Sequence, residues 1–324
     1  MRPVIGWPIA VVLSLMSVIA FVNGEALNEW VKEHAININS SEQAPLVGIT
    51  DDEVWFVVLV DFPDQDEQEN CDQQRASNLI DDSAKEHLKQ GFGPQSTLEI
   101  DYHDRIVTTD FGMKDYGHDA NGENDVGRNG VSPHTLAEEV VQEIKNEVDD
   151  WSRYDLNDDG WVDRFLILHC MKPQEDGEND KSRIWSHFSS IENTVELPGD
   201  LKISHYTIAS QQSSKYFGTI LHEMYHQLGA ADLYAVHDAT VNQDWKGIGK
   251  WDIMASGNYN GNGAWPALLT SPSIELIGGV RHQDVELTWL PGTDCVGPVY
   301  SFQGFAKGGN SLKIPIGNDE FIWI

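Results

Sequence analysis

The stretch from His222 to Asp232, HEMYHQLGAAD, has residue types and a spacing that could hold a metal ion. On a helix, His222 and His226 are four residues apart and project from one face, close enough to bind the same ion. Neutral imidazoles suit zinc, and a catalytic zinc takes three protein ligands and leaves one position for water. Glu223 lies next to the first histidine, where its carboxylate can take a proton from that water. The spacing therefore predicts a hydrolytic zinc centre with Glu223 as the general base.

The third ligand has to come from residues that follow this helix. Gly229 can adopt a left-handed conformation that ends the helix and turns the chain sharply. That turn makes Asp232 the expected third ligand, and Asp238 is the nearest competitor. Further along, Met254 lies in a glycine-rich segment, and its distance from the motif is typical of the methionine turn that supports zinc sites. Ordinary core packing is the alternative interpretation of this methionine.

A second motif, DLNDDGWVD, has oxygen-bearing side chains at the spacing of a calcium loop. The expected ligands are Asp155, Asn157, Asp159 and Asp163. The glutamate that usually completes such a loop is absent, so we expect a short variant in which calcium stabilises the fold. An acidic turn between a helix and a strand is the alternative. The acidic loop 115–130 could also hold calcium, but a plain surface loop is favoured.

Buried strands and amphipathic helices are the elements that must position these residues. Apolar or alternating runs predict strands at 54–60, 98–111 (two short strands), 164–171 and 201–210. Helical spacing predicts a helix at 73–90 with its C-cap at Gly91, a second helix at 132–148 and a third around the zinc motif. The strand at 201–210 comes just before the zinc helix and could be a sheet edge that pairs with an extended substrate.

Both ends of the chain have features of their own. Residues 1–24 resemble a secretory signal, with Arg2, an apolar run that is short for a membrane span, and small residues for cleavage. An uncleaved anchor is the alternative. Residues 25–50 are expected to form an N-terminal arm or a short propeptide, and residues 51–324 the catalytic domain. The chain ends in an apolar, strand-like run at 319–324, which suggests a fragment truncated from a longer protein.

Charge and cysteine content narrow the classes of partner. The net charge of −31, from 52 acidic and 21 basic residues, argues against binding to nucleic acid or anionic membranes. Three cysteines leave at least one without an intrachain partner. Cys170 lies in an apolar run and is expected to be a buried thiol, and Cys71–Cys295 is a candidate disulfide.

Several motifs together resemble the secreted metallopeptidases of the immune inhibitor A family. They are HEMYHQLGAADLY, GKWDIMASG, IWSHF, DLNDDGWVDRFLILH and VVLVDFPD, and they cover residues 54–324 with gaps. The resemblance implies a metzincin-like fold of the α+β or α/β class. A twisted mixed sheet and the active-site helix would form an upper subdomain, with a smaller irregular lower subdomain after the zinc motif. It also implies zinc as cofactor, with His222 and His226 as ligands, Glu223 as general base and Met254 in the methionine turn.

The chain departs from the family pattern at two positions. Relatives usually have an acidic residue where this chain has Ala235. If that residue is the third zinc ligand in relatives, either Asp232 serves in its place here or the site is altered. Tyr225 also replaces the small residue that commonly precedes the second histidine. Both departures bear on activity rather than on fold.

The predicted function is that of a secreted zinc-dependent endopeptidase acting on polypeptides, with calcium as a second cofactor. No nucleic-acid partner and no stable membrane association after signal removal are expected. One alternative is a catalytically inactive, calcium-stabilised pseudo-peptidase that acts as a binding module. Another is a hydrolase of a non-peptide substrate, because the zinc motif specifies how water is activated but not which bond is attacked.

Overall fold

A computed structural model describes residues 43–64, 71–176, 180–212, 217–236, 247–286 and 299–324. Residues 44–324 form one compact unit, which includes the last residues of the predicted N-terminal arm. The predicted signal segment 1–24, residues 25–42 of that arm, Asp238 and Cys295 lie outside the described residues. Within the described ranges, every helix is too short or too polar to cross a membrane.

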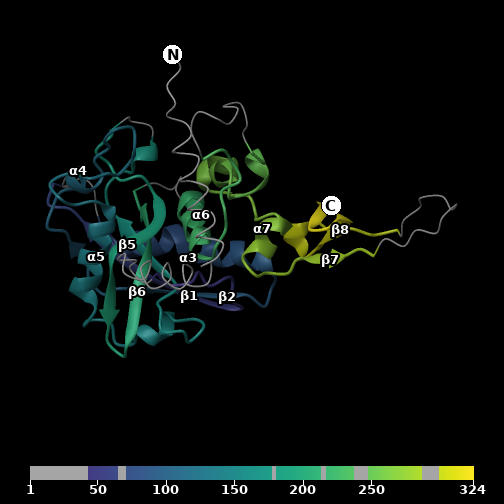
Figure 1. Ribbon diagram of the computed structural model, residues 1–324, viewed down its shortest axis with the longest axis horizontal. Helices are drawn as coiled ribbons and strands as arrows, with labels where there is room; N and C mark the ends of the chain where they lie inside the picture. Colours follow the sequence, from purple (N-terminus) through teal and green to yellow (C-terminus); the bar gives the residue numbers. More distant parts are fainter. Residues whose placement is uncertain (1–42, 65–70, 177–179, 213–216, 237–246, 287–298) are drawn as a thin grey trace, which may run out of the picture. The chain divides into compact units, whose positions relative to one another are not determined.

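The larger sheet is twisted and mixed, and it has six strands in the order β2-β1-β4-β6-β5, with β3 beside β1 (Figure 1). The strands are β1 (Asp52–Asp61), β2 (Thr97–Tyr102), β3 (Val107–Thr108), β4 (Phe165–His169), β5 (His187–Leu197) and β6 (Leu201–Ser210). All neighbouring pairs are parallel except β5 and β6, which are antiparallel. The predicted mixed α/β class is confirmed.

Strand β1 is covered on both faces, as its continuous apolar run predicts. Phe56, Val58 and Val60 belong to one core cluster, and alternate residues such as Trp55 and Val57 belong to the other. This alternation follows from the two-residue period of a strand. The sheet therefore separates two apolar layers, and β1 contributes to both.

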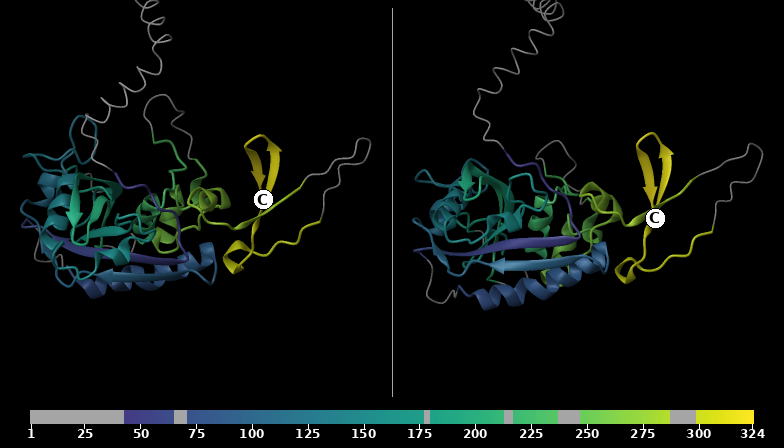
Figure 2. Two further views of the ribbon diagram at one scale, coloured as in Figure 1. Left: turned by 60° about the horizontal axis from the view of Figure 1, so that its bottom comes forward. Right: turned by 90° about the horizontal axis from the view of Figure 1, so that it is seen from below.

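Helices cover both faces of the sheet. Helix α5 (Pro133–Ile144) packs on the face of Phe56, while α3 (Gln73–Phe92) and α6 (Phe217–Gln227) pack on the opposite face. Figure 2 shows α3 running alongside β1 and β2. The described residues also form the short helices α4 (Met113–Tyr116), α7 (Ser271–Leu276), η1 (Trp151–Tyr154), η2 (Gln174–Asp176), η3 (Gly249–Trp251), η4 (Ser256–Gly263) and η5 (Phe305–Lys307).

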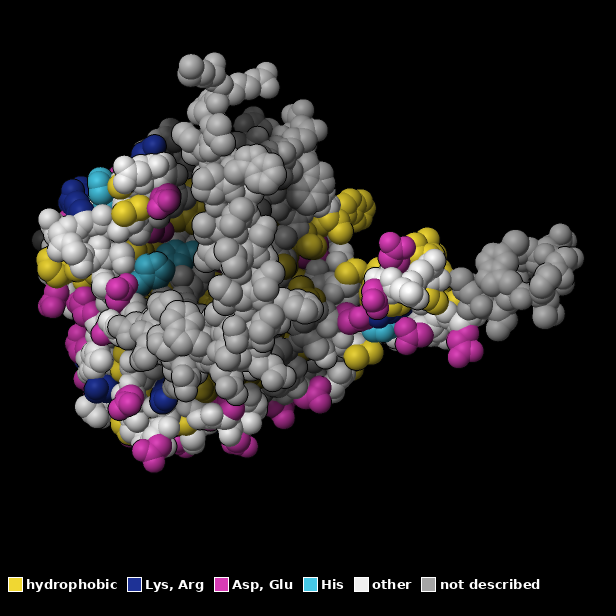
Figure 3. All heavy atoms as spheres, in the orientation of Figure 1, with side chains coloured by type: hydrophobic (Ala, Val, Ile, Leu, Met, Phe, Trp, Pro, Cys, Tyr) yellow, Lys and Arg dark blue, Asp and Glu magenta, His cyan; other side chains and the backbone are white. Residues whose placement is uncertain are grey.

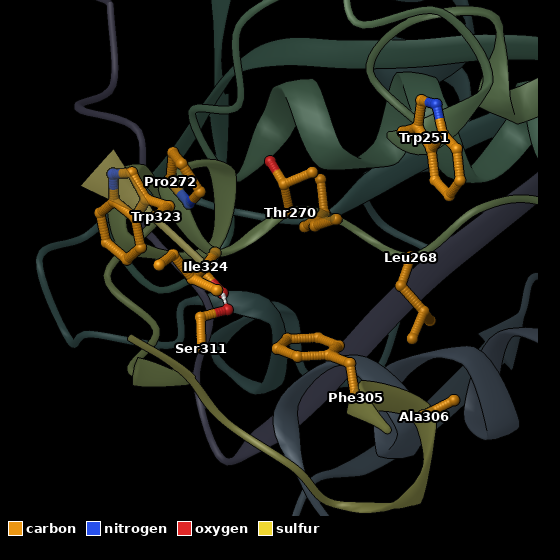
Figure 4. A pocket seen from close by; sticks show the side chains of 11 residues that line it. Trp251, Leu268, Thr270, Pro272, Phe305, Ala306, Ser311, Trp323 and Ile324 are labelled. Atoms are coloured by element: carbon orange, nitrogen blue, oxygen red, sulfur yellow. Dashed lines mark hydrogen bonds between the residues drawn. The ribbon is translucent and has the colours of Figure 1, made fainter. Parts of the chain in front are cut away.

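The described residues after α6 contain short helices and a second, three-stranded sheet. Its strands are β7 (His282–Asp284), β8 (Ser311–Gly317) and β9 (Glu320–Trp323), in the order β7-β8-β9. An apolar pocket of about 480 Å³ is lined by the segment 268–272, Trp251, Phe305, Ala306, Ser311, Trp323 and Ile324. Figure 4 shows Leu268, Phe305 and Ile324 among the side chains that line it.

Two helix ends differ from those predicted. Helix α3 continues through Gly91 to Phe92 and is capped by Gly93, which has φ +120°. Helix α5 ends at Ile144 rather than near 148, and the chain then turns toward η1. In both cases the apolar spacing identifies the helix, while the last turn depends on contacts that the spacing does not contain.

The sheet edge and the disulfide also differ from the predictions. Strand β6 lies inside the sheet between β4 and β5, so β5 forms the edge that was expected at 201–210. Cys71 pairs with Cys170 across a Cα–Cα distance of 5.0 Å, so Cys170 is not a free thiol and the pairing with Cys295 is wrong. Cys170 follows β4 and Cys71 precedes α3, and the packing of that helix on the sheet brings the two together.

Candidate metal centre

Helix α6 places the two histidines of the motif on one face. Its other face is apolar, and Ile220, Leu221 and Met224 are buried in the cluster that packs on the sheet. The packed face fixes the rotation of the helix about its axis, so His222 and His226 project together. Their ring centroids are 4.9 Å apart.

The chain turns back directly after α6. Gly229 has φ +93°, a left-handed conformation that costs a glycine little, and its N–H donates to the carbonyl of His226 over 3.0 Å. The turn brings Asp232 to the histidines. Its Oδ1 lies 3.2 Å from Nε2 of His222 and 3.3 Å from Nε2 of His226.

Backbone carbonyls fix the tautomers of both histidines. Nδ1 of His222 lies 2.7 Å from the carbonyl oxygen of Ile253, and Nδ1 of His226 lies 2.8 Å from that of Ala230. Because a carbonyl oxygen only accepts, each Nδ1 must carry the hydrogen. The lone pair of each Nε2 is then free to bind a metal, which is the usual arrangement around a ligating histidine.

The donor set fits a metal ion. The ligand atoms of His222, His226 and Asp232 all lie within 4.8 Å of one another, and no other group of three such residues occurs among the described residues. Oδ1 of Asp232 is buried and accepts no hydrogen bond from the described part of the chain. Burial opposes ionisation of Asp232, but His222 and His226, when they are protonated, outweigh burial and hold the pKa of its carboxyl well below the usual range.

Glu223 lies beside this group. Its side chain is largely buried, and Oε1 is 4.0 Å from Nε2 of His222. Burial raises the pKa of Glu223, although His222 and His226 partly oppose that shift. A buried carboxylate next to the candidate metal ligands is well placed to accept a proton.

The segment that contains Met254 packs beside the candidate metal centre. Met254 is fully buried in the same apolar cluster as the inner face of α6. Its carbonyl oxygen accepts from the N–H of Leu233, 2.7 Å away, and the preceding carbonyl is the partner of His222. The segment therefore contacts the helix and the turn that carry the candidate metal ligands.

Several residues near Glu223 are not among the predicted site residues. The Tyr234 ring stacks near that of His222, with centroids 6.5 Å apart. Glu175 accepts two hydrogen bonds from Ser186, and burial, reinforced by repulsion from Glu223, raises the pKa of Glu175 to about 7. The motif IWSHF was the only sequence signal for this region, because it contains Ser186.

Carboxylates of the acidic loop 155–163 accept hydrogen bonds from backbone amides of the same loop. Asp155 accepts from the N–H groups of Asp159 and Gly160, and Asp163 accepts from the N–H of Leu156 over 2.7 Å. Among the described residues, the three aspartates of the predicted calcium ligand set do not converge as the residues of the metal centre do. Calcium binding by Asp155, Asn157, Asp159 and Asp163 therefore stays a prediction.

Comparison with known proteins identifies the family. The His-His-Asp group, which could hold a metal ion, lies on α6 and the turn after it, and α6 packs on the mixed sheet. The family model for the immune inhibitor A peptidase M6 catalytic domain matches residues 101–273, which is more than half of the chain. The chain belongs to this family of metallopeptidases, and the match includes all of α6, Asp232 and Met254. No curated protein matches the chain.

Proposed function

We propose that this protein is a secreted zinc-dependent endopeptidase with Glu223 as its general base. The observation that carries the proposal is the convergence of Nε2 of His222, Nε2 of His226 and Oδ1 of Asp232 beside the Glu223 carboxylate. Family membership supports peptide-bond hydrolysis. Secretion rests on the signal-like composition of residues 1–24.

Zinc is the metal that suits these donors best. Two neutral imidazoles and one carboxylate make a typical catalytic zinc set, whereas calcium prefers six to eight oxygen ligands. Asp232 supplies the third ligand, and Ala235 has no side-chain donor with which it could replace Asp232. The carbonyl partners of both histidines support this assignment, because in the neutral ring they place the hydrogen on Nδ1 and leave the lone pair of Nε2 for the metal.

The chain's own residues supply the proton transfers. Bound zinc would act as a Lewis acid and lower the pKa of water in the site. Glu223 takes a proton from the attacking water and then delivers it to the leaving amine. The raised pKa of Glu223 favours this exchange, because a base of higher pKa accepts a proton more readily.

Strand β5 gives the site an edge on which a polypeptide can lie. It is the outermost strand beside β6, and it begins at His187. The charge of His187 lowers the pKa of Glu223, which places the start of β5 near the site. An extended substrate can add to such an edge through main-chain hydrogen bonds. On the face in Figure 3, acidic side chains are spread over the described surface with few basic ones between them. Together with the net charge of −31, this supports polypeptide rather than nucleic-acid partners.

Substitution of Glu223 by Gln tests the mechanism. E223Q keeps the shape of the side chain and removes the base, so casein cleavage should fall by about 100-fold or more while zinc still binds. The matched control is E86Q, on the exposed side of α3, which should cleave like the wild type. Full activity in E223Q would contradict the mechanism.

Metal removal tests the cofactor. Casein cleavage should stop with a zinc chelator and return when zinc is restored. A wild-type chain that binds one zinc and cleaves no unfolded protein would instead support the inactive binding module.

A further inference from the structure

One fully buried carboxylate, that of Asp252, accepts four hydrogen bonds beside the metal centre. Its Oδ1 accepts from the N–H of Met254 over 2.8 Å. Its Oδ2 accepts from the N–H and the hydroxyl of Thr270, at 2.8 and 2.7 Å, and from the hydroxyl of Ser273 at 2.8 Å. Burying a charged group is costly unless such bonds are made, so this cluster is a specific arrangement rather than general packing.

The peptide groups that Asp252 holds contact two parts of the metal centre. The carbonyl oxygen of Ile253, the next residue, is the partner of His222 Nδ1 at 2.7 Å. The carbonyl oxygen of Met254 accepts from the N–H of Leu233, which directly follows Asp232. One carboxylate thus fixes a short segment whose two carbonyls orient the first and the third metal ligands.

We infer that Asp252 is a positioning residue for the metal centre. It touches neither the metal ligands nor the substrate and acts through the Ile253 and Met254 carbonyls. Groups that orient metal ligands from outside are commonly worth a factor of about 10 to 100 in metal affinity. The inference rests on the proposed zinc site and adds a residue that sets how tightly that site binds.

The partners of Asp252 extend to the wall of a pocket. Figure 4 shows Thr270 on the apolar pocket, between Trp251 and Pro272. Thr270 therefore connects Asp252 to the wall of the pocket. The contacts between Asp252 and the metal centre run instead through the backbone of Ile253 and Met254. Variants of Thr270 can weaken the carboxylate's anchoring without changing any residue next to a metal ligand.

Zinc affinity, measured by competition with a chromogenic chelator, tests the inference without using activity. D252N retains the size of the side chain, but its amide nitrogen cannot accept, so the bonds to one of the two oxygens are lost. We expect the zinc Kd of D252N to rise about tenfold or more. T270V, which lacks one donor, should show a smaller rise, and T270S, which restores the hydroxyl, should bind like the wild type.

A matched control separates positioning from general stability. Glu53 is also a fully buried carboxylate, and it pairs with Arg164 over 2.8 Å at the start of β1. E53Q should lower the Tm and leave the zinc Kd of the folded protein unchanged.

The possible results distinguish this inference from the proposed function. A D252N chain that melts earlier but binds zinc like the wild type would overturn the inference alone. Should D252N fail to fold, equal zinc Kd values for T270V and the wild type would overturn it instead. A wild-type chain that binds no zinc would refute the proposed function and this inference together.

Discussion

At the scale of single residues, Tyr225 shows how one departure from the family pattern is accommodated. Its hydroxyl is buried and lies 2.9 Å from Nδ1 of His87, whose Nε2 lies 3.0 Å from the carbonyl oxygen of Ala267. Because that carbonyl only accepts, His87 Nε2 carries the hydrogen and Nδ1 accepts from the tyrosine. Burial lowers the pKa of His87 to about 4, so the ring is neutral near pH 7. The tyrosine therefore ties α6 to α3 through a satisfied polar contact.

Loss of the Tyr225 hydroxyl should leave a buried acceptor without a partner. We expect Y225F to lower the free energy of unfolding by about 1–3 kcal/mol, measured by urea denaturation. In the Y225F/H87F double variant both polar partners are gone, so its loss should be smaller than the sum of the single losses. Additive losses would show that the two side chains are not coupled.

At the scale of elements, the turn after α6 has to deliver Asp232 to the histidines. Gly229 has φ +93°, and a Cβ there would meet no atom within 4 Å, so only the backbone conformation disfavours a side chain. We expect G229A to cost about 1–2 kcal/mol of stability and to weaken zinc binding, because the strained turn displaces Asp232. Zinc Kd values from chelator competition check this.

A second turn offers the matched control. Gly199, between β5 and β6, has φ +83° and the same open surroundings. G199A should cost a similar amount of stability and leave the zinc Kd unchanged. If both variants bind zinc equally well, the turn at Gly229 does not control the position of Asp232.

Local patterns predicted most elements, and contacts between distant segments account for those that were missed. Strand β1 and helix α6 have apolar periods that need no knowledge of their neighbours. Strand β5 has few buried residues and an irregular register on β6 between Ser190 and Val195, so its sequence gives no clear period. Cys71 and Cys170 are separated by 99 residues, and only the packing of α3 on the sheet brings them together. The approach of Asp232 was predictable because Gly229 is a local signal.

At the scale of the whole molecule, Asp163 couples the acidic loop to pH-dependent stability. Burial raises its pKa to about 7, and repulsion from Asp159 and Asp155 adds to the shift. In the unfolded chain the pKa of an aspartate is about 4. Between these values the folded state binds more protons than the unfolded state, so the free energy of unfolding falls as the pH rises. Above about pH 7 the carboxylate is ionised in both states, so its destabilising contribution is complete and stays constant unless a cation binds to it.

Calcium should remove part of that destabilisation if the loop 155–163 binds it. At pH 8 calcium should raise the Tm of the wild type, because a ligand that binds only the folded state stabilises it by about 2.7 kcal/mol at one hundred times its Kd. D163N should show a flatter decline in stability from pH 5 to pH 8 and a smaller gain from calcium. D158N is the control, because Asp158 lies in the same loop, outside the predicted ligand set, and asparagine tolerates its φ of +59°. Equal calcium effects in the wild type and D163N would place any calcium site elsewhere in the molecule.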